Sequence, residues 1–508
     1  MSNRIKYLFS STNGLVLMAI AIISIIAAIW GTLSGPMVEM GVRDITVKVL
    51  GMKMVEAERE GRVIMLYHVI AMAVIAILVY LITANVRMDK KLALFANALV
   101  TAGYLIVVPA GLLFAYFGRN WVMHGMYVFG LSMIFLSGLI LAVALWPWNK
   151  KYYLEKGSPY AHLPSGLDLE RVAFWAMTLA TLGSAALGGM VASYFGNGFE
   201  VFLAEDTIRH PVKNHLQLSI VGHLHIMLAL MGIAITLVMG RWLDFKGIWH
   251  KIAMPSMVLG TITLTIGAWA VVPAQNIAHT IIYVGAVFSM SGGLFLVIYG
   301  MPKLVKDRLQ EQGLVKATFW QKTMALFHDP LKFGVLWQMI FMNFTTSFVG
   351  IFMAIRLTEI FRVWPHREER IELAGHWHIL SAIIAIMILF YFLDRIGLKG
   401  RIRQWFGWTM IIASDLAFAA ITVFEMKRLF VTEYMQQPVV NLTMILTDIG
   451  LGLILILLAG FLIWRIIDLF KSKGLWIKEL EETDIEVTCL DETTTVQSKQ
   501  ESGREVSQ

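Results

Sequence analysis

Two histidines stand in a strongly apolar stretch of the sequence, GHWHILSAIIAIMILFYF, in which a single tryptophan separates His376 from His378. An ionisable side chain in such a stretch is costly in hydrocarbon and by default suggests a functional site. Imidazole is a common ligand of metals and of haem iron, and it also exchanges protons near neutral pH. These residues therefore point to metal, haem or proton chemistry inside an apolar region.

The spacing of the two histidines restricts that chemistry. Residues i and i+2 of an α-helix point about 200° apart, so one helix offers one imidazole on each of two opposite flanks. A single ion chelated by one helix prefers the i, i+4 spacing of H-E-x-x-H. The H-x-H spacing therefore favours two large cofactors beside the helix, and haem is the usual large cofactor held by transmembrane histidines.

Segments of this kind recur three times, as GRVIMLYHVIAMAVIAILVYLI, QLSIVGHLHIMLALMGIAITLV and IELAGHWHILSAIIAIMILFYF. Each carries histidine about one turn into an apolar run, and they are the second, sixth and tenth such runs. Three four-helix units would bring their imidazoles to one depth, namely those of His68, His223, His225, His376 and His378. A lone intramembrane histidine is often only a hydrogen-bonded packing residue, but five at matching depth favour ligation of a metal or haem.

Composition places these segments in a membrane. The chain has 508 residues, of which 57% are hydrophobic and 15% charged, and its mean hydropathy is +0.69. A membrane crossing needs roughly 20 apolar residues, and twelve runs qualify: 14–30, 64–84, 93–117, 122–146, 172–194, 219–239, 254–273, 279–300, 335–357, 374–393, 406–424 and 442–465.

We therefore predict an all-α, polytopic membrane protein with about twelve transmembrane helices in three pseudo-symmetric four-helix units. This membrane domain covers residues 1–470. Residues 471–508 are predicted to form a disordered cytoplasmic tail, because the stretch from about residue 478 is acidic, rich in Ser and Thr and has little to bury.

Basic residues predict the orientation of the helices. With the N-terminus in the cytoplasm, the loops NVRMDKK, NKKYYLEK and DRIGLKGRIR lie inside, as the positive-inside rule requires. The C-terminus is then also cytoplasmic, and the five histidines lie near the outer third of the membrane. The basic start of the chain lacks a small-residue cleavage signature, so the first helix is predicted to be retained. The net charge of +7 is attributed to membrane anchoring and not to nucleic acid.

Cysteine usage limits the cofactors. The single cysteine, Cys489, excludes a disulfide framework and a cysteine-held metal cluster within the chain, and there is no C-x-x-C-H motif for covalent haem. Any metal or cofactor is therefore expected to use His, Met or carboxylate groups.

This pattern resembles subunit I of the heme-copper oxidase superfamily, which includes cytochrome c oxidases and nitric oxide reductases. The resemblance implies a low-spin haem between His68 and His378, a high-spin haem on His376, and haem propionates bound by Lys427 and Arg428 in FEMKRLF. It also implies two haems, most simply of the b type. The expected partners are membrane lipid, a quinone or quinol, and cytochrome c or another redox subunit, in a bacterial or archaeal cytoplasmic membrane.

The chain departs from that family at the copper site. The family binds its second metal through one histidine on helix six and an adjacent pair on helix seven, whereas helix seven here, PSMVLGTITLTIGAWAVV, contains no histidine. Helix six reads GHLHIMLALMG and lacks the H-P-E-V-Y form with its tyrosine. Copper is therefore not expected, which argues against oxygen reduction.

Helix six instead offers a second G-H-x-H, whose His223 or His225 would meet His376 across a second haem. An iron with two imidazole ligands has no open position for O2 or NO. The chain would then pass electrons between the quinol pool and a redox partner on the outer side.

Two alternatives stay open. If His376 holds a five-coordinate haem and His223 stands free beside it, the chain is a terminal oxidase or nitric oxide reductase with an atypical second metal site. If no haem binds, it is a transporter whose histidines form a proton or metal-ion path.

Four further polar residues lie in or near the apolar runs. His124 and His279 hold equivalent places in their units and would either ligate a further haem, line a quinol pocket or only bond the membrane interface. Asp415 and Asp448 would either belong to a proton path or be satisfied by a neighbouring Ser or Thr.

Charged residues also follow the ninth apolar run. Arg356 and Glu359 are three residues apart near the end of that helix and are expected to pair. Three arginines that follow would either assist haem propionates or belong to a solvated loop: Arg362, Arg367 and Arg370.

Overall fold

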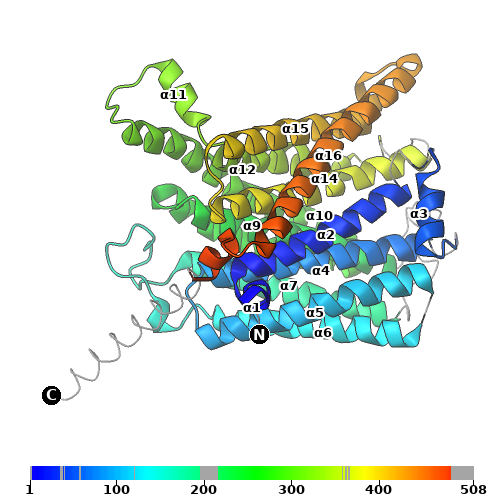
Figure 1. The fold of residues 1–508 in the computed structure, drawn as a ribbon, viewed down its shortest axis with the longest axis horizontal. Coiled ribbons are helices and arrows are strands. Elements are labelled where there is room, and N and C mark those ends of the chain that lie inside the picture. The colour runs from blue at the N-terminus through cyan, green and yellow to red at the C-terminus, as the bar shows by residue number, and fades with distance from the viewer. Residues whose placement is uncertain are drawn as a thin grey trace.

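The computed structural model of the chain is mostly helical in the part that it describes (Figure 1). It describes residues 3–34, 38, 40–55, 59–118, 120–194, 215–356, 359–360, 363 and 366–481, and no β-strand occurs among them. Eleven helices in these ranges are long and apolar enough to cross a membrane. The chain is thus an all-α, polytopic membrane protein, as its sequence predicted.

The membrane-spanning elements follow the predicted apolar runs. They are α2 (Thr12–Ser34), α4 (Arg59–Asn85), α5 (Lys90–Phe117), α6 (Trp121–Ala144), α7 (Leu169–Tyr194), α9 (His215–Trp242), α10 (Gly247–Glu311), a span made of α12 (Pro330–Ile340), η5 (Phe341–Ser347) and α13 (Phe348–Ile355), then α14 (His366–Arg395), α15 (Gly400–Phe430) and α16 (Glu433–Phe470). The shorter elements are α1 (Asn3–Ser10), α3 (Val42–Leu50), η3 (Lys150–Tyr152) and α11 (Phe319–Leu326).

The long element α10 supplies two of the predicted spans. A straight helix of its 65 residues would be about 100 Å long, whereas the hydrocarbon core of a bilayer is about 30 Å thick. Its backbone leaves the helical region at Ala274 (φ −150°, ψ 64°), and Gly267 then lies against Ile282 on the returning arm. The predicted runs 254–273 and 279–300 are therefore the two antiparallel arms of α10.

The spans pack in a repeating order, as three four-helix units require. The first helix of each unit packs on the second, with α2 on α4, α7 on α9 and α12 on α14, and α5 packs on α6 as α15 does on α16. Small residues let these last two pairs approach closely, since Gly103 meets Gly130 and Gly450 meets Ala413. Helix α9 packs on both α4 and α14, which brings the three histidine-bearing helices together.

The two ends of the helix bundle are named here after their short helices. At the α1 end, the Tyr7 hydroxyl donates to the Glu479 carboxylate at 2.7 Å, and Arg465 pairs with the same carboxylate at 3.0 Å. At the α3 end, α3 lies across the ends of the spans (Figure 1). Residues 471–481, which we assigned to the tail, are therefore folded against the bundle, and 482–508 lie outside the described residues.

Candidate functional site

The histidines of α4 and α9 meet near the α3 end of the bundle. The ring of His68 lies beside that of His223, with centroids 6.3 Å apart and planes inclined by 12°. The second histidine of α9, His225, faces α14, where its ring contacts Trp377 edge to face at a centroid distance of 4.6 Å. The two imidazoles of α9 thus point to different neighbouring helices, as the i, i+2 spacing predicted.

The two histidines of α14 also have different neighbours. The ring of His376 lies beside Gly350 of α13. The Nε2 atom of His378 forms a hydrogen bond with the hydroxyl of Tyr67 on α4, and its ring lies 6.1 Å from that of Trp30 on α2. Helix α14 therefore offers imidazoles on two flanks, one of them towards α4.

The contacts of α4 differ from the pairing that the resemblance implied. That pairing put His68 opposite His378, whereas in the structure His68 lies beside His223 and its neighbour Tyr67 meets His378. Successive residues of a helix point about 100° apart, so α4 turns Tyr67 towards α14 when it turns His68 towards α9.

Three of the rings are held through Nδ1. In each case the acceptor is a backbone carbonyl, so Nδ1 carries the proton and Nε2 keeps its lone pair. Metal-ligating histidines are typically oriented in this way. The bonds are His68 Nδ1 to Ile64 O at 2.9 Å, His223 Nδ1 to Ser184 O at 3.0 Å and His225 Nδ1 to Val221 O at 2.7 Å.

A glycine of α7 makes room for one of these rings. The backbone of α7 passes so close to His223 that a Cβ atom at Gly188 would overlap the imidazole, whereas a Cβ atom at the next residue, Gly189, would meet nothing. Only hydrogen at position 188 therefore permits His223 to lie between α7 and α4.

Helix α15 brings a buried carboxylate against Gly375, the residue before His376. Glu425 is 1% exposed, and its carboxylate fills the space that a side chain at Gly375 would need. Lys427 is 3% exposed and donates to a carbonyl of its own helix, while Arg428 is half-buried. Sequence reasoning named the two basic residues and missed Glu425, because an acid beside a basic pair near a helix end is usually solvated.

The other histidine candidates lie among aromatic rings. The ring of His124 contacts Phe114 and Trp121 at centroid distances of 5.5 and 5.6 Å. His279 lies 6.4 Å from the ring of Tyr283. Among the described residues, no three His, Cys, Asp or Glu side chains gather as a metal-binding cluster.

The intramembrane acids are not joined into a chain by the bonds of the described residues. Asp415 accepts the indole N–H of Trp337 at 3.0 and 2.9 Å, and Asp448 is half-buried on α16. Arg356 pairs with Glu359, which confirms that prediction. The described side chains do not include three of the predicted candidates: Arg362, Arg367 and Arg370.

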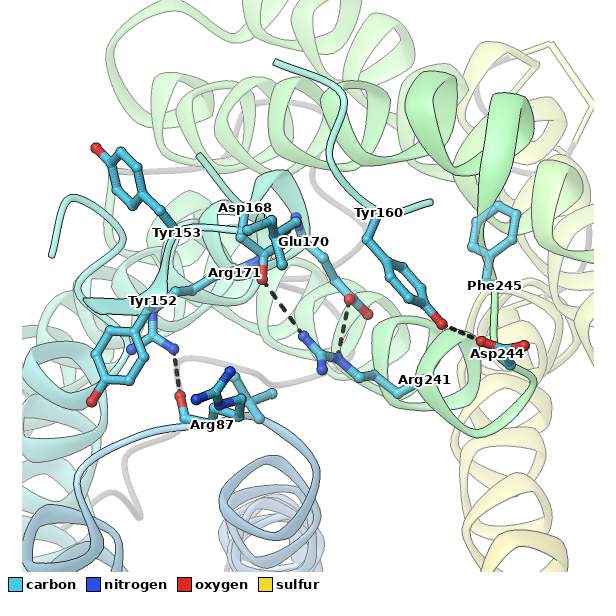
Figure 2. Close-up of a pocket in the computed structure, with 12 residues that line it drawn as sticks. Arg87, Tyr152, Tyr153, Tyr160, Asp168, Glu170, Arg171, Arg241, Asp244 and Phe245 are labelled. Carbon is cyan, nitrogen blue, oxygen red and sulfur yellow. Dashed lines mark hydrogen bonds and ion pairs between the residues drawn. The ribbon is translucent and has the colours of Figure 1, made fainter. Parts of the chain in front are cut away.

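A second polar group, which the sequence analysis did not single out, surrounds a cavity of about 250 Å³ at the α1 end (Figure 2). Arg241 of α9 pairs with Glu170 at 3.0 Å and lies 3.8 Å from Asp168. On the other side of the cavity, the Tyr160 hydroxyl donates to Asp244. Burial raises the pKa of Asp168, and the nearby Glu170 raises it further.

Two histidines near Glu170 are in direct contact with each other. Nε2 of His162 is 2.7 Å from Nδ1 of His250, and His250 is 1% exposed, with its Nε2 3.9 Å from Glu170. If both rings are neutral and His162 donates its Nε2 proton to His250 Nδ1, then His250 carries its own proton on Nε2. That proton faces the Glu170 carboxylate, so no lone pair of the ring is turned towards the negative charge. The pair therefore ties the α6–α7 connection to α10.

Acidification is expected to loosen this corner. Burial lowers the pKa of His162 below its ordinary value of 6.5, and His250 and Lys251 lower it further. A group with a lowered pKa in the folded state gives stability that is present above pH 6.5 and is lost as the pH falls through the folded-state pKa. Thermal unfolding of the chain in detergent should therefore show a smaller loss between pH 7.5 and 5.5 for His162→Gln than for wild type; equal losses would contradict this expectation.

A comparison of the chain with known protein families, with curated proteins and with solved structures finds no match.

Proposed function

We propose that the chain is an integral membrane haem protein of respiratory electron transfer, in which His68 and His223 hold one b-type haem between α4 and α9. The main support is the geometry of this pair. Bonds of about 2 Å from imidazole to a metal put two rings on opposite sides of one ion with their centroids roughly 6 Å apart. The centroids of the His68 and His223 rings are 6.3 Å apart, which matches this separation.

The groups around the pair fit this role. Both rings keep the lone pair of Nε2 for a metal, because Nδ1 carries the proton and donates it to Ile64 O in His68 and to Ser184 O in His223. Gly188 lies against the Cε1 edge of the His223 ring and limits the movement of that ring. When bound, haem supplies the remaining ligands of its iron and takes up or releases one electron.

A second haem is proposed on the imidazoles of α9 and α14 that remain. His225 and His378 have exposed side chains within membrane spans, where an ionisable group is costly in free energy and suggests a functional site. Together with His376 they offer donors for a haem beside α14, and Lys427 and Arg428 of α15 would bind its propionates. The α1 end then faces the cytoplasm, and electrons pass between the quinol pool and a redox partner at the α3 end.

Spectroscopy of the purified, haem-supplied protein tests this function. The dithionite-reduced spectrum is expected to show b-type bands that carbon monoxide leaves unchanged, because irons with two imidazoles have no open position. A band shifted by carbon monoxide would overturn the carrier and favour an O2 or NO reductase. A folded protein without any haem band would leave the haem-free proton or metal-ion transporter.

A methyl group added against the Cε1 edge of His223 should weaken haem binding while both histidines remain. In Gly188→Ala the new Cβ displaces the imidazole from Ser184 O, and loss of such orienting contacts typically costs about tenfold to hundredfold in affinity. Haem dissociation to apomyoglobin measures the effect. Gly189→Ala is the matched control, since its Cβ meets nothing; equal retention of haem in both variants would contradict the site.

A further inference from the structure

Aromatic and basic residues form a turn between α6 and α7 at the α1 end. The sequence there is WPWNKKYY, residues 146–153, and it contains no acid. Trp146 and Trp148 contact each other and Trp175 of α7 edge to face, at centroid distances of 4.9, 5.5 and 5.0 Å. Trp146 is 50% exposed and Trp148 is 47% exposed, so both indoles leave a large apolar area on the surface.

A buried arginine holds this turn in place. Arg171 of α7 is 2% exposed and donates to the backbone carbonyls of Ala144, Trp146 and Arg87. Its guanidinium lies 3.8 Å from the ring centroid of Tyr152, which lines the cavity of Figure 2. The aromatic surface is therefore built in advance, and ordering it on binding costs little further entropy.

Apolar, aromatic and cationic side chains follow one another around the turn, in the same order as the acyl chain, the interface and the phosphate of a phospholipid in a membrane. Leu139 and Val143 are exposed on one face of α6 at 43% and 62%, and they lead towards Trp146. Beyond the indoles, Lys150 and Lys151 are exposed. The order from the membrane outward is apolar, aromatic and cationic, which matches acyl chain, membrane interface and phosphate.

We propose that this turn is a binding site for an anionic phospholipid. Lys150 and Lys151 bind the phosphate, and the exposed indoles together with the face of α6 pack against an acyl chain. The acids at the start of α7 do not cancel this charge, because Glu170 is 6% exposed and Asp168 is 9% exposed, and both face Arg241. Glu155 of the same connection is exposed, but the exposed Lys156 follows it directly. The site does not depend on haem.

A competing occupant exists in the chain itself. Residues 482–508 are acidic and would suit the two lysines by charge. They contain no aromatic side chain, however, and so offer little to cover the exposed indoles. An anionic lipid offers a phosphate for the two lysines and an acyl chain for the exposed indoles. It is therefore a better occupant than residues 482–508, which match only the lysines.

Native mass spectrometry of the full chain tests the site with dioleoyl phosphatidylglycerol and dioleoyl phosphatidylcholine. The wild type is expected to prefer the anionic lipid. Each basic residue near an anionic lipid contributes roughly fivefold, so Lys150→Gln/Lys151→Gln should lower the affinity for phosphatidylglycerol about thirtyfold and leave phosphatidylcholine unchanged. Trp148→Ser should weaken both lipids.

The matched control is Lys316→Gln/Lys322→Gln, which removes the same charge from two exposed lysines of the α10–α11 connection and α11. It should keep the preference for phosphatidylglycerol. If it weakened phosphatidylglycerol binding as much as Lys150→Gln/Lys151→Gln does, the preference would come from the overall positive charge of this end of the protein, and the proposed site would be wrong. Competition by glycerol phosphate as effective as that by the lipid would mean a site for free anions. Lipid binding that appears only in a variant ending at Glu481 would assign the surface to residues 482–508.

Discussion

Replacing either His68 or His223 with leucine is expected to remove one and the same haem from the purified protein. If both imidazoles serve one iron, the variant His68→Leu/His223→Leu loses no more haem than either single variant. Leucine is apolar and tolerated at this depth, so the helices should still insert and pack. Haem per polypeptide, measured as the pyridine haemochrome, gives the result.

His124→Leu is the control for this experiment, because His124 lies on α6 and contacts the rings of Phe114 and Trp121 instead of the pair. It should retain the full haem content. Losses that add in the double variant would put the two histidines on different irons, and full haem in both single variants would refute the assignment. Free imidazole should restore the six-coordinate spectrum in His223→Gly, as expected when the missing group is a ligand.

Replacing Arg171 with methionine is expected to destabilise the whole protein by about 3 kcal/mol or more. Arg171 is 2% exposed, and its donors serve the carbonyls of Ala144, Trp146 and Arg87. Methionine fills part of the volume but donates nothing, so these acceptors lose their partner in a poorly solvated place. Arg171→Lys should lie between wild type and Arg171→Met, because one ammonium cannot serve three diverging carbonyls.

Thermal unfolding followed by tryptophan fluorescence in detergent measures this loss. Arg401→Met, at an exposed position near the start of α15, removes the same charge and should change the midpoint little. A midpoint for Arg171→Met that equals that of Arg401→Met would show that the end of α6 is held by other contacts.

The number and positions of the spans followed from local properties of the sequence. Each of the twelve apolar runs lies largely within helical segments of the structure, because a segment that must bond its own backbone in hydrocarbon has helix as its simplest solution. The pair Arg356 and Glu359 was also predictable from local spacing, because the two residues are only three apart; they pair just beyond the end of α13. The folding of residues 471–481 was not, because it depends on Glu479 reaching Tyr7 and Arg465.

Contacts between distant segments escaped the sequence analysis at both ends of the bundle. Glu425 reaches the backbone of Gly375, and His162 reaches His250, although nothing in the spacing of these residues links them. From sequence alone, a polar residue near a helix end is expected to be solvated. Only the tertiary structure shows whether another helix covers it.

The sequence by itself determined that the chain is helical, that it crosses the membrane many times, and that His223 and His225 point to different sides of one helix. These properties depend on apolar run length and on the fixed turn of a helix. Only the tertiary structure decided that His68 meets His223 and that Tyr67 meets His378. That choice depends on how far α4 is rotated about its own axis, and a rotation of about 100° exchanges one residue for the next; the packing of the whole bundle sets this rotation.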